Sequence, residues 1–251
     1  MEFRSETGGV TVTLEGGIAD VRLDRPDKLN ALDLAMFGHI RDALDWLGGE
    51  EELRCVVLSG EGRSFCVGID LAVLQSGVGD LTERTHGPAN ALQQVAWGWR
   101  TLPVPVIAAI HGHCFGAGIQ MALGADIRIA RADSELSIME MRHGLIPDLA
   151  AFPLSRGVVR EDVLRELIYT AKKVPGPEAQ AMGLVSRLAD DPHAEAMALA
   201  RDIASKSPPA IRAAKRLFAR LPEDDAATLL QAESDEETKL IARVMQAMTK
   251  G

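Results

Sequence analysis

The chain has 251 residues, of which 27 are lysine or arginine and 36 are aspartate or glutamate, so its formal net charge is −9 at pH 7. This length predicts one large domain, or a core with a small appendage. The acidic balance without a long basic stripe excludes a nucleic-acid groove, although a few local cations remain available for a phosphorylated ligand.

The chain begins with a predicted β-hairpin followed by a helix. Residues 10–14 and 18–23 read as two strands because they flank the turn Glu15-Gly16-Gly17. Asp33 is a candidate N-cap, and apolar residues at helical spacing carry the helix after it to about Leu47.

The next stretch alternates in the same way. Residues 55–58 predict a short buried strand, and residues 89–102 predict a helix. Between them, residues 74–88 are polar and show no period, which predicts a loop or a mobile flap.

The central stretch predicts a strand, a glycine turn and a buried helix. Residues 104–110 are an apolar strand, a glycine cluster lies within 112–118, and good helix formers occupy 119–123. The N–H groups at the start of such a helix favour negative charge in front of them. Gln120, in the first turn, is a buried polar group that needs a partner or a function.

The last part of the chain is mainly helical. Alternating strands and helices before it predict an α/β fold with a largely parallel sheet, and Pro208-Pro209 marks a joint before the final two helices. Strands are expected at 127–130, 136–139 and 184–188, a turn at 144–148, and helices at 149–156, 161–170, 178–182, 194–206, 209–220 and 225–248.

Two turns of similar sequence suggest a site for a negatively charged oxygen. Residues 65–70 and 115–119 both lead a small-residue or glycine backbone into a helix start. If the turns face each other, the N–H groups of Ile69 and Ala117 converge on one oxygen and form an oxyanion hole. The alternative is two ordinary tight turns that need glycine for their backbone geometry.

Two carboxylates are candidates for acid–base chemistry. Glu140 follows a short apolar strand, where burial raises the pKa of a carboxyl group and suits it to act as a base. The alternative is a solvated acid or a partner of Arg142. Asp148 is either a helix N-cap or a second carboxylate that enters the same pocket.

Metal and nucleotide motifs are missing from the sequence. His111, His113 and His143 show no ligand spacing and are expected to have structural or surface roles, and the glycines fit neither GxGxxG nor a phosphate-binding P-loop. The sequence predicts a cytoplasmic protein for two reasons. Its three cysteines are an odd number, and it shows neither a signal peptide nor an apolar run of membrane-spanning length.

Several segments together resemble the crotonase superfamily, which includes enoyl-CoA hydratases and isomerases. Their joint order and spacing carry the resemblance over nearly the whole chain. The segments are Leu23-Asp24-Arg25-Pro26, Asn30-Ala31-Leu32, residues 63–71, residues 112–118, residues 125–130, Gly144-Leu145-Ile146-Pro147, and Ser207-Pro208-Pro209-Ala210 with Lys215.

The resemblance implies a spiral of ββα repeats in residues 1–190, with the acyl-CoA pocket, and a helical trimerisation segment in 191–251. It implies a homotrimer or hexamer and an acyl-CoA thioester as ligand, with coenzyme A part of the substrate and no separate cofactor, metal or membrane partner. The oxyanion donors would be Ile69 and Ala117. The substrate-binding residues would be Lys28, Leu29, Val67, Asp70, Leu71 and Ala72.

The sequence departs from the hydratase pattern at Gln120, where hydratases carry a glutamate; Glu140 matches their second glutamate. An amide cannot usefully transfer a proton, and losing a general acid–base group costs roughly 10²–10⁴ in rate. The 3-enoyl isomerases keep the one glutamate at the position of Glu140. Dienoyl-CoA isomerases keep it too, with an aspartate at the position of Asp148, but carry an acid where Gln120 stands.

Three hypotheses follow from these residues. The first is a double-bond isomerase, or another enzyme of enolate proton transfer, that uses Glu140 and Asp148 with Gln120 as a positioning donor. The second is a hydratase in which Gln120 holds the water and Glu140 moves both protons. The third is a non-catalytic acyl-CoA-binding homologue.

The sequence does not determine which cations would bind the phosphates of coenzyme A. Arg25 and Lys28 are candidates near the predicted site, and Lys215 or Lys239 from a neighbouring subunit are two more.

Overall fold

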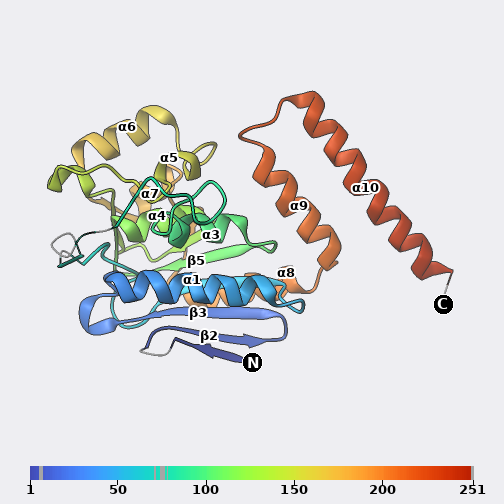
Figure 1. Ribbon diagram of the computed structural model, residues 1–251, viewed down its shortest axis with the longest axis horizontal. Helices are drawn as coiled ribbons and strands as arrows, with labels where there is room; N and C mark the ends of the chain where they lie inside the picture. Colours follow the sequence, from blue (N-terminus) through green and yellow to red (C-terminus); the bar gives the residue numbers. More distant parts are fainter. Residues whose placement is uncertain (6–7, 71, 74–76, 78, 250–251) are drawn as a thin grey trace.

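The computed structural model describes residues 1–249 apart from 6–7, 71, 74–76 and 78. Figure 1 shows a layered α/β body from which the last two helices, α9 (Pro208–Arg220) and α10 (Ala226–Met248), project to one side. Leu71 of the predicted substrate-binding set lies outside the described residues.

The main sheet has seven strands in the order β1-β2-β3-β4-β5-β7-β10. The predicted hairpin is confirmed, since β2 and β3 pair antiparallel, and from β3 to β10 every pairing is parallel. The strands are β1 (Glu2–Arg4), β2 (Gly9–Glu15), β3 (Ile18–Asp24), β4 (Cys55–Gly60), β5 (Val106–Ile110), β7 (Ile127–Ala130) and β10 (Arg187–Leu188).

A second sheet of three short strands holds the central glycine turn. Its members are β6 (His113–Phe115), β8 (Glu135–Ser137) and β9 (Val174–Pro175), in the order β6-β8-β9. The sequence missed β6 and β9 because strands of three and two residues show no alternation that can be read. The strand expected at 136–139 ends at Ser137.

The helices cover both faces of the main sheet. Asp33 caps the first helix as predicted, by accepting a hydrogen bond of 2.9 Å from the Met36 N–H. The helices that precede the C-terminal pair are α1 (Leu34–Gly49), α3 (Gln94–Thr101), α4 (Ala117–Gly124), α5 (Ala151–Leu154), α6 (Glu161–Thr170), α7 (Gly176–Ala181) and α8 (Pro192–Ala204), with 3₁₀ turns η1 (Pro26–Lys28) and η2 (Glu140–His143).

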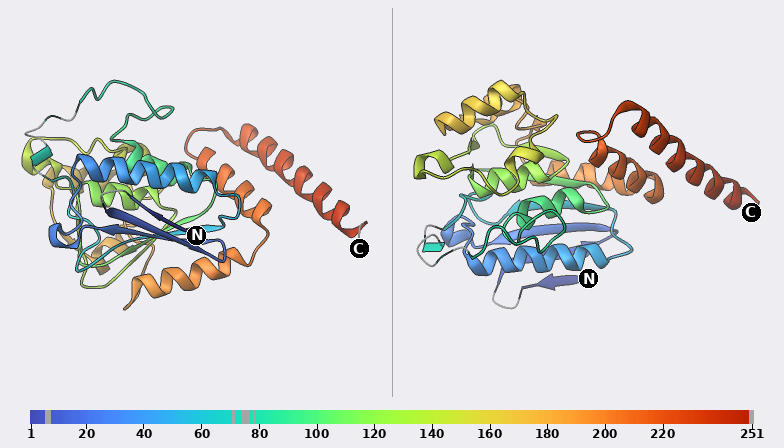
Figure 2. Two further views of the ribbon diagram at one scale, coloured as in Figure 1. Left: turned by 60° about the horizontal axis from the view of Figure 1, so that its bottom comes forward. Right: turned by 45° about the horizontal axis from the view of Figure 1, so that its top comes forward.

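The main sheet separates two apolar cores, one on each of its faces. In β4, Val56 and Leu58 pack with α1 and α3, whereas Cys55 and Val57 pack with Ala196 of α8. This alternation follows from the two-residue repeat of a strand. Figure 2 (left) shows α8 on the side of the sheet opposite to α1.

The helix expected at 89–102 starts later, at Gln94. The Asn90 side chain causes the delay, because its Oδ1 accepts the N–H groups of Leu92 (3.0 Å) and Gln93 (2.7 Å) and holds a turn there. In the described part of the chain, no helix is both long and apolar enough to cross a membrane.

A partly buried ion pair fastens α9 to the body. Lys215 is 6% exposed, and its Nζ lies 2.7 and 2.6 Å from the two carboxylate oxygens of Asp126. Asp126 also accepts the Val106 N–H at 2.7 Å, so one carboxylate joins β5 to the C-terminal segment. The structure thus shows contacts of both α8 and α9 with the body, because α8 packs on the sheet and the Lys215–Asp126 pair holds α9. The division of the chain between residues 190 and 191 stays a prediction.

We expect Lys215→Met to lower the free energy of unfolding by about 3 kcal/mol, because Asp126 keeps its charge without its cation. Urea unfolding of the variant measures the change. Lys206→Met removes a matched pair with Asp202 that is exposed, and should change stability by about 0.5 kcal/mol or less. Equal effects of the two substitutions would show that the Lys215 pair does not fasten α9.

Candidate active site

The start of α4 lies against the Glu140 carboxylate. Gly116, the residue before the helix, has φ +52°, and its N–H donates to the Ser137 carbonyl at 2.9 Å. A Cβ at Gly116 would lie 3.3 Å from Glu140 Oε1. The positive φ favours glycine at this position, and a Cβ there would also crowd the acid.

The two turns expected to face each other do lie together. A Cβ at Gly68 would lie 3.1 Å from the Phe115 carbonyl oxygen and 3.5 Å from the Ala117 nitrogen. A parallel bridge joins Cys66 to Cys114 just before this contact.

The N–H groups of both candidate donors are available. Leu32 donates to the Gly68 carbonyl and accepts from the Asp70 N–H, each at 2.8 Å, so the Ile69 N–H between them points away from Leu32. Ala117 is the first residue of α4 and has no intrahelical acceptor. Neither N–H donates to an acceptor among the described residues, which is the condition that an oxyanion site requires.

The Gln120 amide is fixed at both ends. The Leu149 N–H donates to Gln120 Oε1 at 2.8 Å, and Gln120 Nε2 donates to Glu140 Oε1 at 2.7 Å. Because a backbone N–H can only donate, the amide oxygen must face Leu149 and the nitrogen must face Glu140. Gln120 is 1% exposed, so this bridge is shielded from water.

Glu140 is a half-buried acid with one free oxygen. Its Oε2 is buried and finds no hydrogen-bond partner in the described structure. Burial raises the pKa of Glu140, and the nearby Asp148 charge raises it further, while its own backbone N–H and the Gln120 amide lower it; the net pKa is above its usual range. Glu140 begins η2, three residues after Ser137, the last residue of β8.

Asp148 is not a helix N-cap, which corrects that alternative. The helix after it starts at Ala151, and its N-cap is Ala150, a left-handed residue that makes no side-chain cap. The Leu149 N–H is already taken by Gln120. Burial raises the pKa of Asp148, against a smaller opposing effect of its own backbone N–H.

The sequence of the chain matches a known protein family over nearly its whole length. Residues 13–250 match the model of the enoyl-CoA hydratase/isomerase family. The chain belongs to this family. The crotonase-type fold predicted from the sequence is thereby confirmed.

Family relatives include isomerases and hydratases. The chain is 33% identical over 216 residues to the mitochondrial Delta(3,5)-Delta(2,4)-dienoyl-CoA isomerase of Rattus norvegicus, covering 79% of this chain and 64%, under two thirds, of the rat protein. It is 28% identical to the enoyl-CoA hydratase structure from Bacillus anthracis, with a TM-score of 0.84 and 96% of each chain covered. A Thermobifida fusca YX protein solved in complex with CoA is 28% identical, with a TM-score of 0.82 and 95% of each chain covered.

The residues expected along coenzyme A in this family lie in two adjacent segments. Val67 donates its N–H to the Leu29 carbonyl at 3.2 Å, and Lys28 beside it is exposed. The Asp70 carboxylate accepts the Ala72 N–H at 3.2 Å.

Arg25 is occupied by the protein and is not a free cation for a phosphate. Its guanidinium lies 2.9 Å from the Asp33 carboxylate and 3.3 Å from the Asp70 carboxylate, and donates to the Ala31 carbonyl at 3.0 Å. It therefore ties the segment after β3 to the Ile69 turn. Lys215, another phosphate candidate, is likewise occupied, by Asp126.

His113, one of the three histidines near the central segments, has structural partners. His113 Nδ1 lies 3.0 Å from Ser64 Oγ and its Nε2 lies 3.6 Å from Glu135 Oε2, an order seen in catalytic triads. Ser64 is 0% exposed, so this arrangement joins two turns and offers no nucleophile to a substrate. No group of three metal-ligating side chains occurs in the described ranges.

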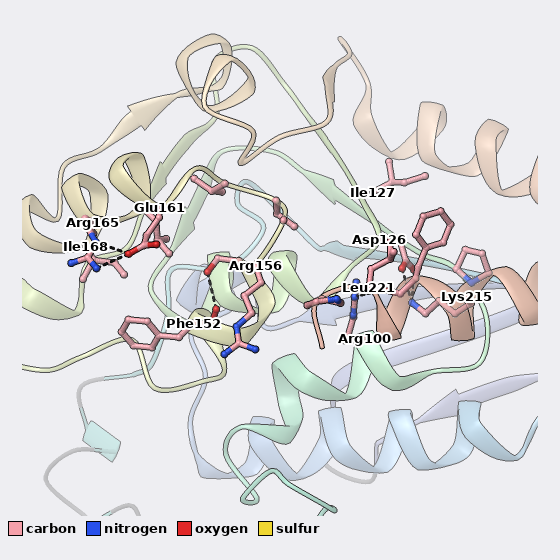
Figure 3. A pocket seen from close by; sticks show the side chains of 18 of the residues that line it. Arg100, Asp126, Ile127, Phe152, Arg156, Glu161, Arg165, Ile168, Lys215 and Leu221 are labelled. Carbon is pink, nitrogen blue, oxygen red and sulfur yellow. Dashed lines mark hydrogen bonds and ion pairs between the residues drawn. The ribbon is translucent and has the colours of Figure 1, made fainter. Parts of the chain in front are cut away.

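A groove of about 1410 Å³ separates the body from α9. Figure 3 shows Asp126 and Lys215 on one side of it and Phe152, Glu161 and Arg165 on the other. Neither Glu140 nor Asp148 lines this groove, although Met141 does. The carboxylate pair and its hydrogen bonds, rather than the size of a cavity, identify the candidate site.

Sequence reasoning missed two groups that shape the site, the Leu149 N–H and the Gln93 side chain. Gln93 Nε2 donates to the Asp148 carbonyl at 3.2 Å, and thereby ties the loop before α3 to the second acid. A backbone N–H leaves no sequence signal, and an amide in a polar loop has no distinguishing period.

We expect Gln120→Leu to raise the pKa of Glu140 further, because a hydrogen bond to the carboxylate is lost. Carboxyl-carbon NMR titration of labelled glutamate measures this pKa. Gln231→Leu, which removes an exposed Gln231–Asp235 bond of 2.8 Å, is the matched control and should leave Glu140 unchanged. A downward shift in Gln120→Leu would contradict the assigned amide orientation.

Proposed function

We propose that this protein is an enzyme that moves a double bond within an acyl-CoA thioester through an enolate. Glu140 is the main base, Asp148 is the second acid–base group, and the N–H groups of Ile69 and Ala117 hold the enolate oxygen. Gln120 positions Glu140. The observation that carries the proposal is the two-ended fixation of the Gln120 amide beside a carboxylate with one free oxygen.

The proposed reaction balances without water. Glu140 Oε2 takes a proton from carbon, and the electron pair moves onto the thioester oxygen, which the two N–H groups stabilise. A proton then returns to a different carbon, from Asp148 or from Glu140, and the thioester carbonyl re-forms. The raised pKa values of Glu140 and Asp148 suit both acids to exchange protons near neutral pH.

The second candidate, a hydratase, needs Gln120 to hold a water molecule. The amide oxygen already accepts from Leu149 and keeps one lone pair, and one amide hydrogen is donated to Glu140, so a single N–H remains as a donor. That N–H can donate to a water but cannot accept a proton from it. This limitation favours isomerisation over hydration.

The third candidate, a non-catalytic acyl-CoA-binding homologue, is opposed by the acids themselves. A protein that only binds has no use for two half-buried carboxylates with raised pKa values, because their burial costs stability.

Coenzyme A enters this proposal as part of the substrate, and no separate cofactor is proposed. We also propose a homotrimer or hexamer built through the C-terminal helices, whose exposed apolar side chains include Phe218, Leu230, Ile241 and Met245. A cytoplasmic location remains our proposal; the three buried cysteines are free thiols, as a reducing compartment favours.

We expect Glu140→Gln to reduce turnover of the best substrate by 10²-fold or more, with acyl-CoA binding retained. A panel of 2-enoyl-, 3-enoyl- and dienoyl-CoA thioesters identifies that substrate by ultraviolet absorbance. Glu178→Gln, at a partly exposed ion pair between α7 and Lys172, is the control. Unchanged turnover in Glu140→Gln would remove Glu140 from the mechanism, and binding without turnover of any panel member would favour the binding homologue.

Gln120→Glu separates the isomerase from the hydratase. The new carboxylate would lie about 2.7 Å from Glu140, so the two would share a proton and one would become a general acid. We expect hydration of crotonyl-CoA to rise by about 10²-fold. If the wild-type protein already hydrates crotonyl-CoA efficiently and the variant gains little, the hydratase is correct.

A further inference from the structure

A basic cavity lies between the C-terminal helices and the turn that leads into β4. Its volume is about 390 Å³, and its walls come from α9, α10 and the residues just before Cys55. Two carboxylates line it, Glu51 and Glu236. Five cations line it as well: Arg54, Arg212, Arg216, Lys239 and Arg243.

Only part of this positive charge is neutralised by the protein. Glu236 is in contact with Arg216 and lies 3.2 Å from Lys239, so two cations share one acid. Arg212 donates to the Leu53 carbonyl at 3.0 Å, which orients its guanidinium without neutralising it. Arg54, Arg212 and Arg243 form no ion pair with an acid of the described residues. Three guanidiniums that form no ion pair in the described structure therefore line one cavity of a chain whose net charge is −9.

We propose that this cavity binds a phosphate-bearing ligand of nucleotide size. Guanidinium groups present forked N–H donors that match phosphate oxygens, and Arg212 is already held in place. The volume lies within the range of about 300–1,000 Å³ found for small-molecule sites. Pro208, Pro209 and Leu240 supply an apolar wall that suits a base or an alkyl chain.

Within one protomer this cavity is separate from the Glu140 site. Arg54 precedes β4, whereas the Ile69 turn follows the other end of that six-residue strand, which spans about 20 Å. The proposal does not rest on the proposed reaction. The phosphates could belong to a free phosphorylated metabolite or to an acyl-CoA thioester held by a second copy of the chain, and the experiment distinguishes these sources.

The test uses the full-length protein with inorganic pyrophosphate and adenosine 3′,5′-bisphosphate as probes, measured by calorimetry at low salt. We expect saturable binding that weakens with added salt. Arg243→Gln, at an exposed position, should weaken binding about tenfold, and the triple variant Arg54→Gln/Arg212→Gln/Arg243→Gln about 100-fold or more. The matched control Arg4→Gln/Arg160→Gln/Arg165→Gln removes three exposed arginines elsewhere and should bind as the wild type does.

Two results would overturn the proposal. One is that neither probe binds the wild-type protein at millimolar concentration, and the other is that the triple variant binds no more weakly than its control. Circular dichroism confirms that the triple variant is folded, and Arg243→Gln alone keeps the test valid if it is not.

The source of the phosphates follows from competition. If a saturating acyl-CoA thioester displaces pyrophosphate, and Arg243→Gln raises KM without changing kcat, the phosphates are those of a thioester held by a second copy. If pyrophosphate stays bound, the ligand is a separate metabolite. Both results support the cavity as a phosphate site, and neither depends on which double-bond reaction the protein catalyses.

Discussion

The Gln120 amide is the interaction on which the geometry of the site depends. It accepts the Leu149 N–H and donates to Glu140, so one side chain of α4 fixes the acid and the loop that carries Asp148. A glutamate in the same place would accept the Leu149 N–H equally well, but would put a second carboxylate against Glu140. The amide therefore keeps Glu140 as a single base with one free oxygen, at the cost of a proton-transfer group.

The position of α4 follows from glycine geometry in two turns. Gly116 brings the helix start against Glu140, and Gly68 allows the Ile69 turn to approach the Ala117 nitrogen. Parallel pairing orients the Ile69 N–H, because Leu32 takes the groups on either side of it. Two N–H groups that donate to no acceptor among the described residues are thus held by the backbone beside two acids with raised pKa values.

The C-terminal helices show a contrasting use of charge. Lys215 forms an ion pair with Asp126 that fastens α9, and Arg25 forms ion pairs with two acids that fasten the Ile69 turn. Three arginines without an ion pair in the described structure, Arg54, Arg212 and Arg243, line the cavity between α9 and α10. The fold thus divides the cations into those that hold structure, such as Lys215 and Arg25, and those that form no ion pair among the described residues.

The sequence by itself determined the hairpin, the Asp33 cap, the glycine turn before α4 and the family, because these depend on neighbouring residues or on motif order. It also placed an amide where hydratases have an acid. Only the tertiary structure decided that Gln120 bridges Glu140 to Leu149, that Asp148 caps no helix, and that Lys215 is occupied. These outcomes join groups up to 89 residues apart, and local periodicity carries no information on such contacts.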